Sequence, residues 1–309
     1  MKFRTSAIRA VLASMKVVRP YQMGLADISE VQIKDDLSVV TLVDKLSEEA
    51  AVRELKADFP HLRVLREESG WSEETTYIQV WFFATVDPVD GTVPLSVGAP
   101  TSTVIIALYD RLVRQIVLMV IGQPATGLVW WADQTDCERL AFGLQLDGPP
   151  QSVSTCRVWP GSFDQKAVVL IENFRTFTRT VPTEPPTKRL VWSDQGLQGL
   201  LSSLQSRMAI QNYGSNGLHH VLVADGDKGD NSPAGLAGGI TTAIGGWWDC
   251  GGILAVLSAG GAACGYWVTD DRRLERRDPL DPLSYDFVVY ANSQRSLDVL
   301  CSAVETAFA

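Results

Sequence analysis

The sequence has no long hydrophobic run. A membrane-spanning helix needs about 20 consecutive apolar residues. The most apolar stretch here, residues 104–120, is interrupted by Asp110, Arg111 and Arg114. The first residues, MKFRT, contain neither the apolar core nor the cleavage site of a signal peptide. We therefore expect no membrane partner and a cytoplasmic location.

Histidine is scarce, and the cysteines show no metal-binding spacing. The three histidines include the adjacent pair His219-His220, whose side chains would point to opposite faces of a strand. We expect structural or surface roles for them, and neither a histidine-ligated zinc site nor a Ser-His-Asp triad. The five cysteines form no CxxC motif and are odd in number, which favours reduced thiols in a cytosolic protein.

Positive charge is also in short supply. The formal net charge is −9, which argues against binding nucleic acid or an anionic membrane through a broad basic face. A small phosphorylated ligand stays possible, because bound metal ions change the local sign of the charge. The length of 309 residues fits one large domain or two closely packed ones. The turn-rich segment 149–154 marks the expected boundary, between residues 1–150 and 151–309.

Hydrophobic periodicity and turn residues predict a mixed α/β fold. Helices are expected over residues 5–17, with Pro20 ending the first, and over 44–59, 194–208, the segment from 249 to Gly260-Gly261, and 293–308. Strands are expected over 39–43, 62–65, 81–86, 101–108, 112–121, 127–131, 140–146, 165–171, 219–224 and 287–291. Residues 176–188 and 225–246 are expected to be loops.

The stretch from Trp81 to Thr92 is the most informative part of the chain. Apolar and β-branched residues predict a buried strand that ends at Asp87-Pro88, because proline has no N–H for a central ladder. Asp87 and Asp90 then lie at a strand end, with the Gly91 and Thr92 N–H groups free to point at an anion. Carboxylates beside such N–H groups suit metal-assisted phosphoryl transfer. The alternative is a simple Asp-Pro turn.

Residues 87–92, Asp-Pro-Val-Asp-Gly-Thr, resemble the D-P-[ILV]-D-G-T signature of the inositol monophosphatase superfamily. Residues 247–261 resemble its second signature, W-D-x-A-A/G-x-x-x-x-x-E-A-G-G, with Gly251 and Ser258 as departures. The resemblance runs from about residue 30 to the end. It implies the layered αβαβα sandwich of this superfamily and a Mg²⁺-dependent, often lithium-sensitive phosphatase.

Two acidic positions upstream match the same superfamily. Residues 34–44 fit the spacing K-x-D-x-S-x-V-T-x-x-D, which implies that Asp44 lies near the metals. Residues 66–69 resemble G-E-E-S, with Arg66 in place of the glycine, and imply that Glu67 binds metal. By themselves, Asp44 would be a helix-start carboxylate favoured by the helix dipole, Glu67 a solvated loop acid, and Asp249 an ordinary N-cap.

The resemblance assigns the candidate site as follows. Glu67, Asp87 and the Val89 carbonyl hold the first metal, and Asp87, Asp90 and Asp249 hold the second. Thr92, with Glu67 or Asp44, orients the attacking water, and the Gly91 and Thr92 N–H groups hold phosphate. Residues 213–217 resemble a substrate-pocket turn, which adds Ser215 and Asn216 to Asp249 as substrate contacts. All-oxygen ligands select Mg²⁺, with Mn²⁺ as the other candidate. From the resemblance we expect two or three ions.

The substrate is less well defined than the chemistry. Val93 and Pro94 replace the T-N-F or K-E-F continuation, and residues 240–244 contain no carboxylate to select the alcohol. An inositol or related sugar or polyol monophosphate is the first expectation. A 3′(2′),5′-bisphosphate nucleotide or histidinol phosphate is the alternative, and a non-catalytic binding protein that retains the fold is an alternative of another class. A homodimer is expected from the family alone.

Overall fold

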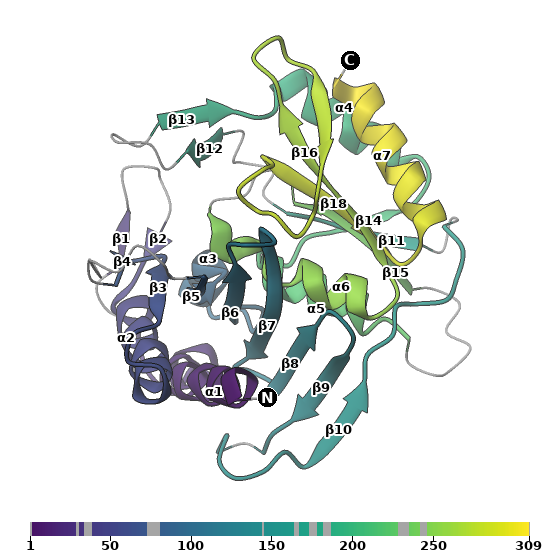
Figure 1. Ribbon diagram of the computed structural model, residues 1–309. Helices are drawn as coiled ribbons and strands as arrows, with labels where there is room; N and C mark the ends of the chain where they lie inside the picture. Colours follow the sequence, from purple (N-terminus) through teal and green to yellow (C-terminus); the bar gives the residue numbers. More distant parts are fainter. Residues whose placement is uncertain are drawn as a thin grey trace.

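The protein is described by a computed structural model that covers residues 2–28, 31–33, 39–72, 81–143, 145–163, 167–172, 178–181, 187–227, 235–241 and 246–308. Two sheets form its framework (Figure 1). The first sheet has eight strands in the order β10-β9-β8-β7-β6-β5-β3-β4. The second has six strands in the order β14-β11-β15-β18-β16-β17. The mixed α/β class is therefore confirmed.

The strands of the first sheet are β3 (Arg63–Arg66), β4 (Gly70–Trp71), β5 (Phe82–Asp90), β6 (Thr103–Asp110), β7 (Gln115–Gln123), β8 (Leu128–Asp133), β9 (Cys137–Ala141) and β10 (Ser152–Thr155). Those of the second are β11 (Ala167–Glu172), β14 (Ala209–Gln211), β15 (Gly235–Thr241), β16 (Ala262–Val268), β17 (Leu274–Arg277) and β18 (Phe287–Ala291). Two small ribbons are formed by β1 (Gln32–Ile33) with β2 (Val39–Val40), and by β12 (Thr178–Val181) with β13 (Thr187–Leu190).

Helices cover the sheets in three layers. The helices are α1 (Lys2–Gln22), α2 (Leu42–Asp58), α3 (Thr92–Ser96), α4 (Asp194–Gln205), α5 (Asn216–Ala224), η1 (Trp247–Cys250), α6 (Ile253–Ser258) and α7 (Gln294–Phe308). Helices α1 and α2 pack on the outer face of the first sheet, and α4 and α7 on the outer face of the second (Figure 1). Helices α5 and α6 lie between the sheets. This is the expected αβαβα layering.

The central core joins the two halves of the chain. Its buried residues come from β5 to β8, from α5 and α6, and from β11 and β18. Strand β10 still belongs to the first sheet although it lies beyond residue 150. The division into residues 1–150, with most of the metal ligands, and 151–309, with Asp249 and the pocket turn, stays a prediction. Within the described residues, no helix combines the length and apolarity needed to cross a membrane.

Some local predictions were wrong. Residues 219–224 belong to helix α5, because the Ser215 side chain caps the helix by accepting from Leu218 N–H at 3.1 Å. This helix is buried, and a short buried helix has the same continuous apolar pattern as a buried strand. Pro20 does not end α1, which continues to Gln22. The strand predicted over 140–146 is shifted to Cys137–Ala141. The loop predicted over 176–188 contains β12 and the start of β13, and the loop predicted over 225–246 contains β15.

Close packing of α1 on the first sheet gives a stability prediction. A Cβ atom at Gly122 of β7 would overlap Met15 Sδ and Val11 Cγ1 of α1. We expect Gly122→Ala to lower the free energy of unfolding by about 1–3 kcal/mol through overpacking. Gly199→Ala is the matched control, because it lies in α4 with no atom within 4 Å, and should stabilise by about 0.5–1 kcal/mol. Urea unfolding compares the two; equal effects would contradict this account.

Candidate active site

The two aspartates of the first motif are brought together by a bulge in β5. The strand does not end at Asp87 as predicted, but continues to Asp90 with a register shift between Asp87, opposite Ile105, and Asp90, opposite Thr103. Residues three apart in a regular strand point to opposite faces. The extra residue of a bulge reverses this alternation, so both carboxylates lie on one face.

Asp90 is fixed by four hydrogen bonds. Its Oδ2 accepts from Ser215 Oγ at 2.6 Å, Thr103 Oγ1 at 2.8 Å and Gly217 N–H at 2.7 Å, and its Oδ1 accepts from Asn216 N–H at 3.1 Å. Burial nevertheless raises the pKa of Asp90, against the lowering effect of these donors. Ser215 and Asn216, predicted as substrate contacts, thus lie against Asp90 at the start of α5.

The third acid comes from a distant part of the chain. Asp249 lies in η1, is buried, and accepts a hydrogen bond from Gly246 N–H at 2.9 Å. Carboxylate oxygens of Asp87, Asp90 and Asp249 all lie within 4.8 Å of one another. The structure therefore brings together acids that are 162 residues apart in the sequence, from 87 to 249.

Electrostatic repulsion within this group is evident at Asp87. Burial is the largest cause that raises the pKa of Asp87 well above its ordinary value, followed by the negative charges of Glu67, Asp90 and Asp249. Glu67 is therefore a close neighbour of Asp87; its backbone N–H donates to Val86 O at 3.1 Å at the end of β3. Three buried carboxylates lie together, with the half-buried Glu67 beside Asp87, and this arrangement suits a cation.

Asp44 and Thr92 form a second, adjacent pair. Asp44 is the third residue of α2, and its Oδ2 accepts from the N–H of the N-cap Thr41 at 2.8 Å and from the Thr41 hydroxyl at 2.5 Å. Its Oδ1 accepts from Thr92 Oγ1 at 2.9 Å. The Thr92 hydroxyl also lies 3.2 Å from the Val89 carbonyl oxygen. Asp44 therefore acts as the predicted helix-start carboxylate, because it caps α2. It also orients Thr92 beside the acids.

Gly91 is required by the backbone. Its φ is +94°, in the left-handed region, and an added Cβ would lie 2.7 Å from Gly214 O. Gly91 and Thr92 are the N-cap and first residue of α3, where N–H groups have no acceptor within the helix. Some residues of the predicted patterns lie outside the described residues. They are Lys34, Asp36 and Ser38 of the pattern before α2, and positions 242–244 of the segment in which no carboxylate was found.

Two residues of α2 that support the site were not predicted from the sequence. Ser47 Oγ donates to Pro88 O at 2.9 Å and so holds the bulge of β5. Glu48 accepts from Glu68 N–H at 2.9 Å and from the Ser69 hydroxyl, and so holds the turn that follows Glu67. A signal was present: Ser47 lies four residues before Ala51, on the buried face of the helix, where a polar residue needs a partner.

Comparisons with known proteins show relatives of this chain. The chain is 34% identical over 150 residues to a bifunctional phosphatase, chloroplastic IMPL2 of Arabidopsis thaliana, covering 47% of this chain and 38% of the relative. It is 30% identical over 132 residues to inositol monophosphatase of Dictyostelium discoideum, covering 41% and 43%. These matches span well under half of either relative.

The fold is found in solved structures as well. The extragenic suppressor protein SuhB of Bartonella henselae superimposes with a TM-score of 0.70 at 20% identity, over 99% of both chains. The family model described as the inositol monophosphatase family matches residues 2–307. The resemblance stated from the motifs is therefore confirmed: this chain belongs to the inositol monophosphatase family, whose members are phosphatases acting on phosphoric monoesters.

Proposed function

We propose that this chain is a Mg²⁺-dependent phosphomonoesterase that hydrolyses a small phosphorylated metabolite with a metal-activated water. One observation carries the proposal: the three buried carboxylates of Asp87, Asp90 and Asp249, within 4.8 Å of one another and next to Glu67. Burying several like charges together is costly unless a cation compensates them.

The donor set fits a hard divalent cation. Every ligand is an oxygen, from Glu67, Asp87, Asp90, Asp249 and the Val89 carbonyl, which suits Mg²⁺ or Mn²⁺ better than zinc or copper. Bound divalent cations supply a Lewis acid for the phosphoryl group and lower the pKa of water. Phosphate monoesters are among the slowest compounds to hydrolyse without a catalyst, so this contribution is essential.

The remaining residues position the reactants. Asp44 accepts the Thr92 hydroxyl proton in a hydrogen bond and so fixes the direction of its lone pairs, one of which can accept from the attacking water. We assign the binding of phosphate to the N–H groups of Gly91 and Thr92, at the start of α3. The four donors around Asp90 keep its carboxylate in one orientation, so the site is organised before substrate binds.

The first substrate to test is an inositol or related polyol monophosphate. Similarity to the Dictyostelium inositol monophosphatase supports this choice. Phosphate release should be measured over a panel of phosphorylated metabolites, with Mg²⁺, with chelator, and with added Li⁺. Release that requires Mg²⁺ supports the proposal, and inhibition by Li⁺ supports the finer family assignment. A protein without activity on any phosphate ester would contradict it.

Thr92 gives a specific prediction. Thr92→Val removes the hydroxyl that donates to Asp44 and lies beside Val89 O. We expect kcat to fall by about 10²–10⁴, the range for losing a group that positions or transfers a proton, while Thr92→Ser restores most of it. Ser96→Ala is the control in the same short helix, since the half-buried Ser96 hydroxyl donates locally to Val93 O at 2.8 Å. Equal kcat values for Thr92→Val and Ser96→Ala would contradict the assigned role.

We also propose that the protein forms a homodimer, as expected from the family. Sedimentation velocity on the full chain tests this directly. A single species at twice the chain mass of 33.8 kDa supports the dimer, and a monomer at micromolar concentration contradicts it.

A further inference from the structure

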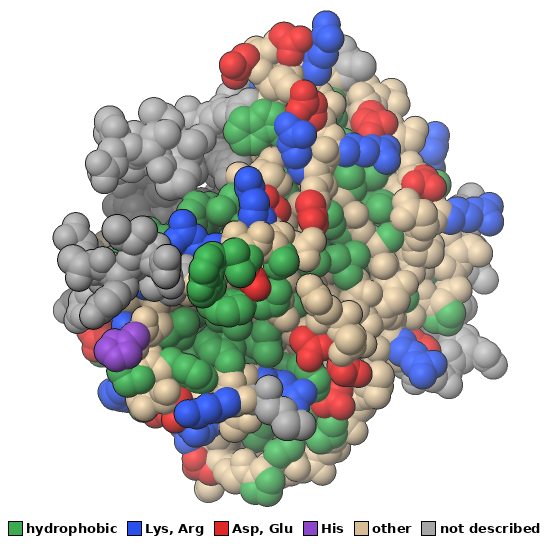
Figure 2. Space-filling model, in the orientation of Figure 1, with side chains coloured by type: hydrophobic (Ala, Val, Ile, Leu, Met, Phe, Trp, Pro, Cys, Tyr) green, Lys and Arg blue, Asp and Glu red, His purple; other side chains and the backbone are tan. Residues whose placement is uncertain are grey.

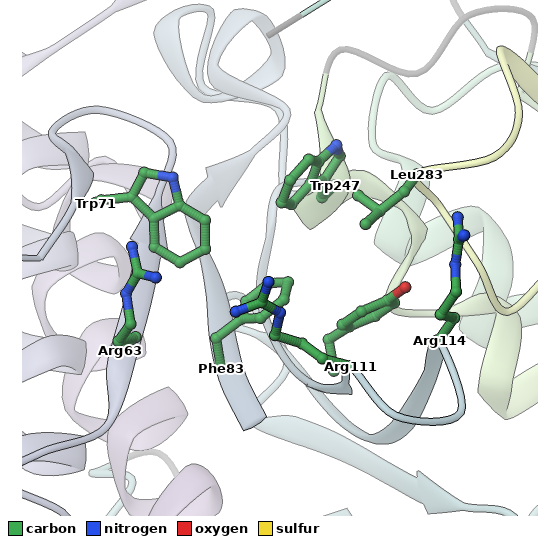
Figure 3. A pocket seen from close by; sticks show the side chains of 8 residues that line it. Arg63, Trp71, Phe83, Arg111, Arg114, Trp247 and Leu283 are labelled. Atoms are coloured by element: carbon green, nitrogen blue, oxygen red, sulfur yellow. The ribbon is translucent and has the colours of Figure 1, made fainter. Parts of the chain in front are cut away.

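A cavity opens on the same face of the first sheet as the acids. Its volume is about 450 Å³, within the range of small-molecule sites. Figure 3 shows Trp71 and Trp247 on opposite sides of it, with Phe83 and Arg111 between them and Arg63 beside Trp71. Figure 2 shows hydrophobic side chains gathered over the middle of the molecule, with basic side chains at their edge.

Three of the aromatic rings that line this cavity pack against one another and form part of its wall. The Trp71 and Phe83 centroids are 5.2 Å apart, those of Phe83 and Trp247 are 5.9 Å apart, and those of Trp71 and Trp247 are 6.3 Å apart. The rings are inclined by 47–74°, so none stacks flat on another. Trp71 is 39% exposed. An exposed tryptophan beside other rings offers a surface for a flat ligand.

Two arginines at this cavity have no ion pair with any residue that the structure describes. The Arg63 guanidinium lies over the Trp71 ring, 4.3 Å from its centroid, and its buried Nε has no hydrogen-bond partner. Within the described chain, neither Arg63 nor Arg111 has a carboxylate partner. Arg114 differs, because it is paired with Asp281 at 3.0 Å. Stacking on a ring leaves the edge of a guanidinium free to bind an anion.

The cavity is separate from the acids. In the strand register Arg63, Phe83 and Tyr109 form one row across β3, β5 and β6. Asp87 lies four residues further along β5, about 13 Å away at 3.3 Å per residue. Thr85, on the same face between them, is only 3% exposed. Trp247 and Asp249 nevertheless belong to the same short helix η1.

We propose that this cavity binds a planar aromatic molecule that carries one anionic group, a carboxylate or a phosphate. The ring packs on the wall formed by Trp71, Phe83 and Trp247, and the anion is bound by Arg63 and Arg111. This site is distinct from the acidic one and does not depend on the proposed phosphatase activity.

Titration with 1-naphthoate, followed by tryptophan fluorescence and calorimetry on the full chain in the presence of Mg²⁺, tests the site. We expect saturable one-to-one binding that weakens at least about tenfold in Arg63→Gln and in Arg111→Gln, as for losing a charged hydrogen bond. Trp71→Leu should weaken it similarly through loss of the ring. Arg53→Gln is the matched control, an exposed arginine of α2 on the other side of the sheet.

Competition identifies the source of the anion. Displacement of 1-naphthoate by adenosine 5′-monophosphate supports a phosphate ligand, and binding of 1-naphthoate without such displacement supports a carboxylate. The proposal would be overturned if inorganic phosphate displaced 1-naphthoate as well as adenosine 5′-monophosphate does. It would also be overturned if both arginine variants kept native thermal stability and the wild-type affinity for 1-naphthoate. If an arginine variant misfolds, Trp71→Leu decides the question. An inactive phosphatase that still binds 1-naphthoate would separate this site from the proposed function.

Discussion

Replacing Asp87 by asparagine is expected to abolish phosphate release while making the metal-free protein more stable. The activity is lost because Asp87 is the carboxylate that we assign to both metals. Removing several kcal/mol of metal-based stabilisation lowers kcat/KM by about a thousandfold or more. The stability rises because a neutral amide replaces a buried charge that repels Glu67, Asp90 and Asp249. Phosphate release and thermal unfolding in chelator measure the two effects.

The same substitution removes a pH dependence. The pKa of Asp87 is raised in the folded protein above its ordinary value of 3.8. The folded state therefore holds this proton more tightly than the unfolded state, and metal-free stability falls as pH rises from about 3.8 through the raised folded pKa. In Asp87→Asn this fall is reduced, because position 87 no longer titrates.

The control for this pair of measurements is Asp27→Asn, the same chemical change at an exposed carboxylate. It should leave both activity and stability as in the wild type. An Asp87→Asn protein that retains Mg²⁺-dependent turnover, or that is less stable than wild type without metal, would contradict the account of the acidic cluster.

Metal removal is the second large effect expected. Chelator should eliminate turnover, and Mg²⁺ should restore it. Mg²⁺ should also stabilise the folded wild type, by about 2.7 kcal/mol at a concentration one hundred times the dissociation constant. Asp249→Asn should lose most of this stabilisation, because Asp249 is the carboxylate that η1 contributes to the acidic cluster. Thermal unfolding over a Mg²⁺ series measures it, and an equal shift in wild type and Asp249→Asn would exclude Asp249 as a ligand.

The sequence was most informative where one motif carries both chemistry and backbone geometry. Asp87, Asp90 and Gly91 were identified from six consecutive residues, and the fold class followed from the two signatures. The bulge that aligns the two aspartates was not foreseen, because Pro88 was read as the end of the strand. A bulge and a strand end have the same local sequence, and only the pairing with β6 distinguishes them.

Features that depend on tertiary packing were harder to predict. The segment 219–224 was predicted as a strand because burial on all sides removes the helical periodicity of α5. Ser47 and Glu48 resemble ordinary first-turn residues until β5 and the turn after β3 are placed beside them. The aromatic cavity joins Arg63 to Trp247, residues 184 positions apart, and no local pattern links them.

Binding of Mn²⁺, followed by electron paramagnetic resonance, tests most directly whether the acidic cluster holds divalent cations. Mn²⁺ replaces Mg²⁺ at oxygen sites, and its free-ion signal falls as it binds. We predict that wild-type protein reduces this signal, that Asp27→Asn does so equally, and that Asp87→Asn and Asp249→Asn reduce it far less. Equal Mn²⁺ binding by all four proteins would contradict a metal centre at Asp87, Asp90 and Asp249.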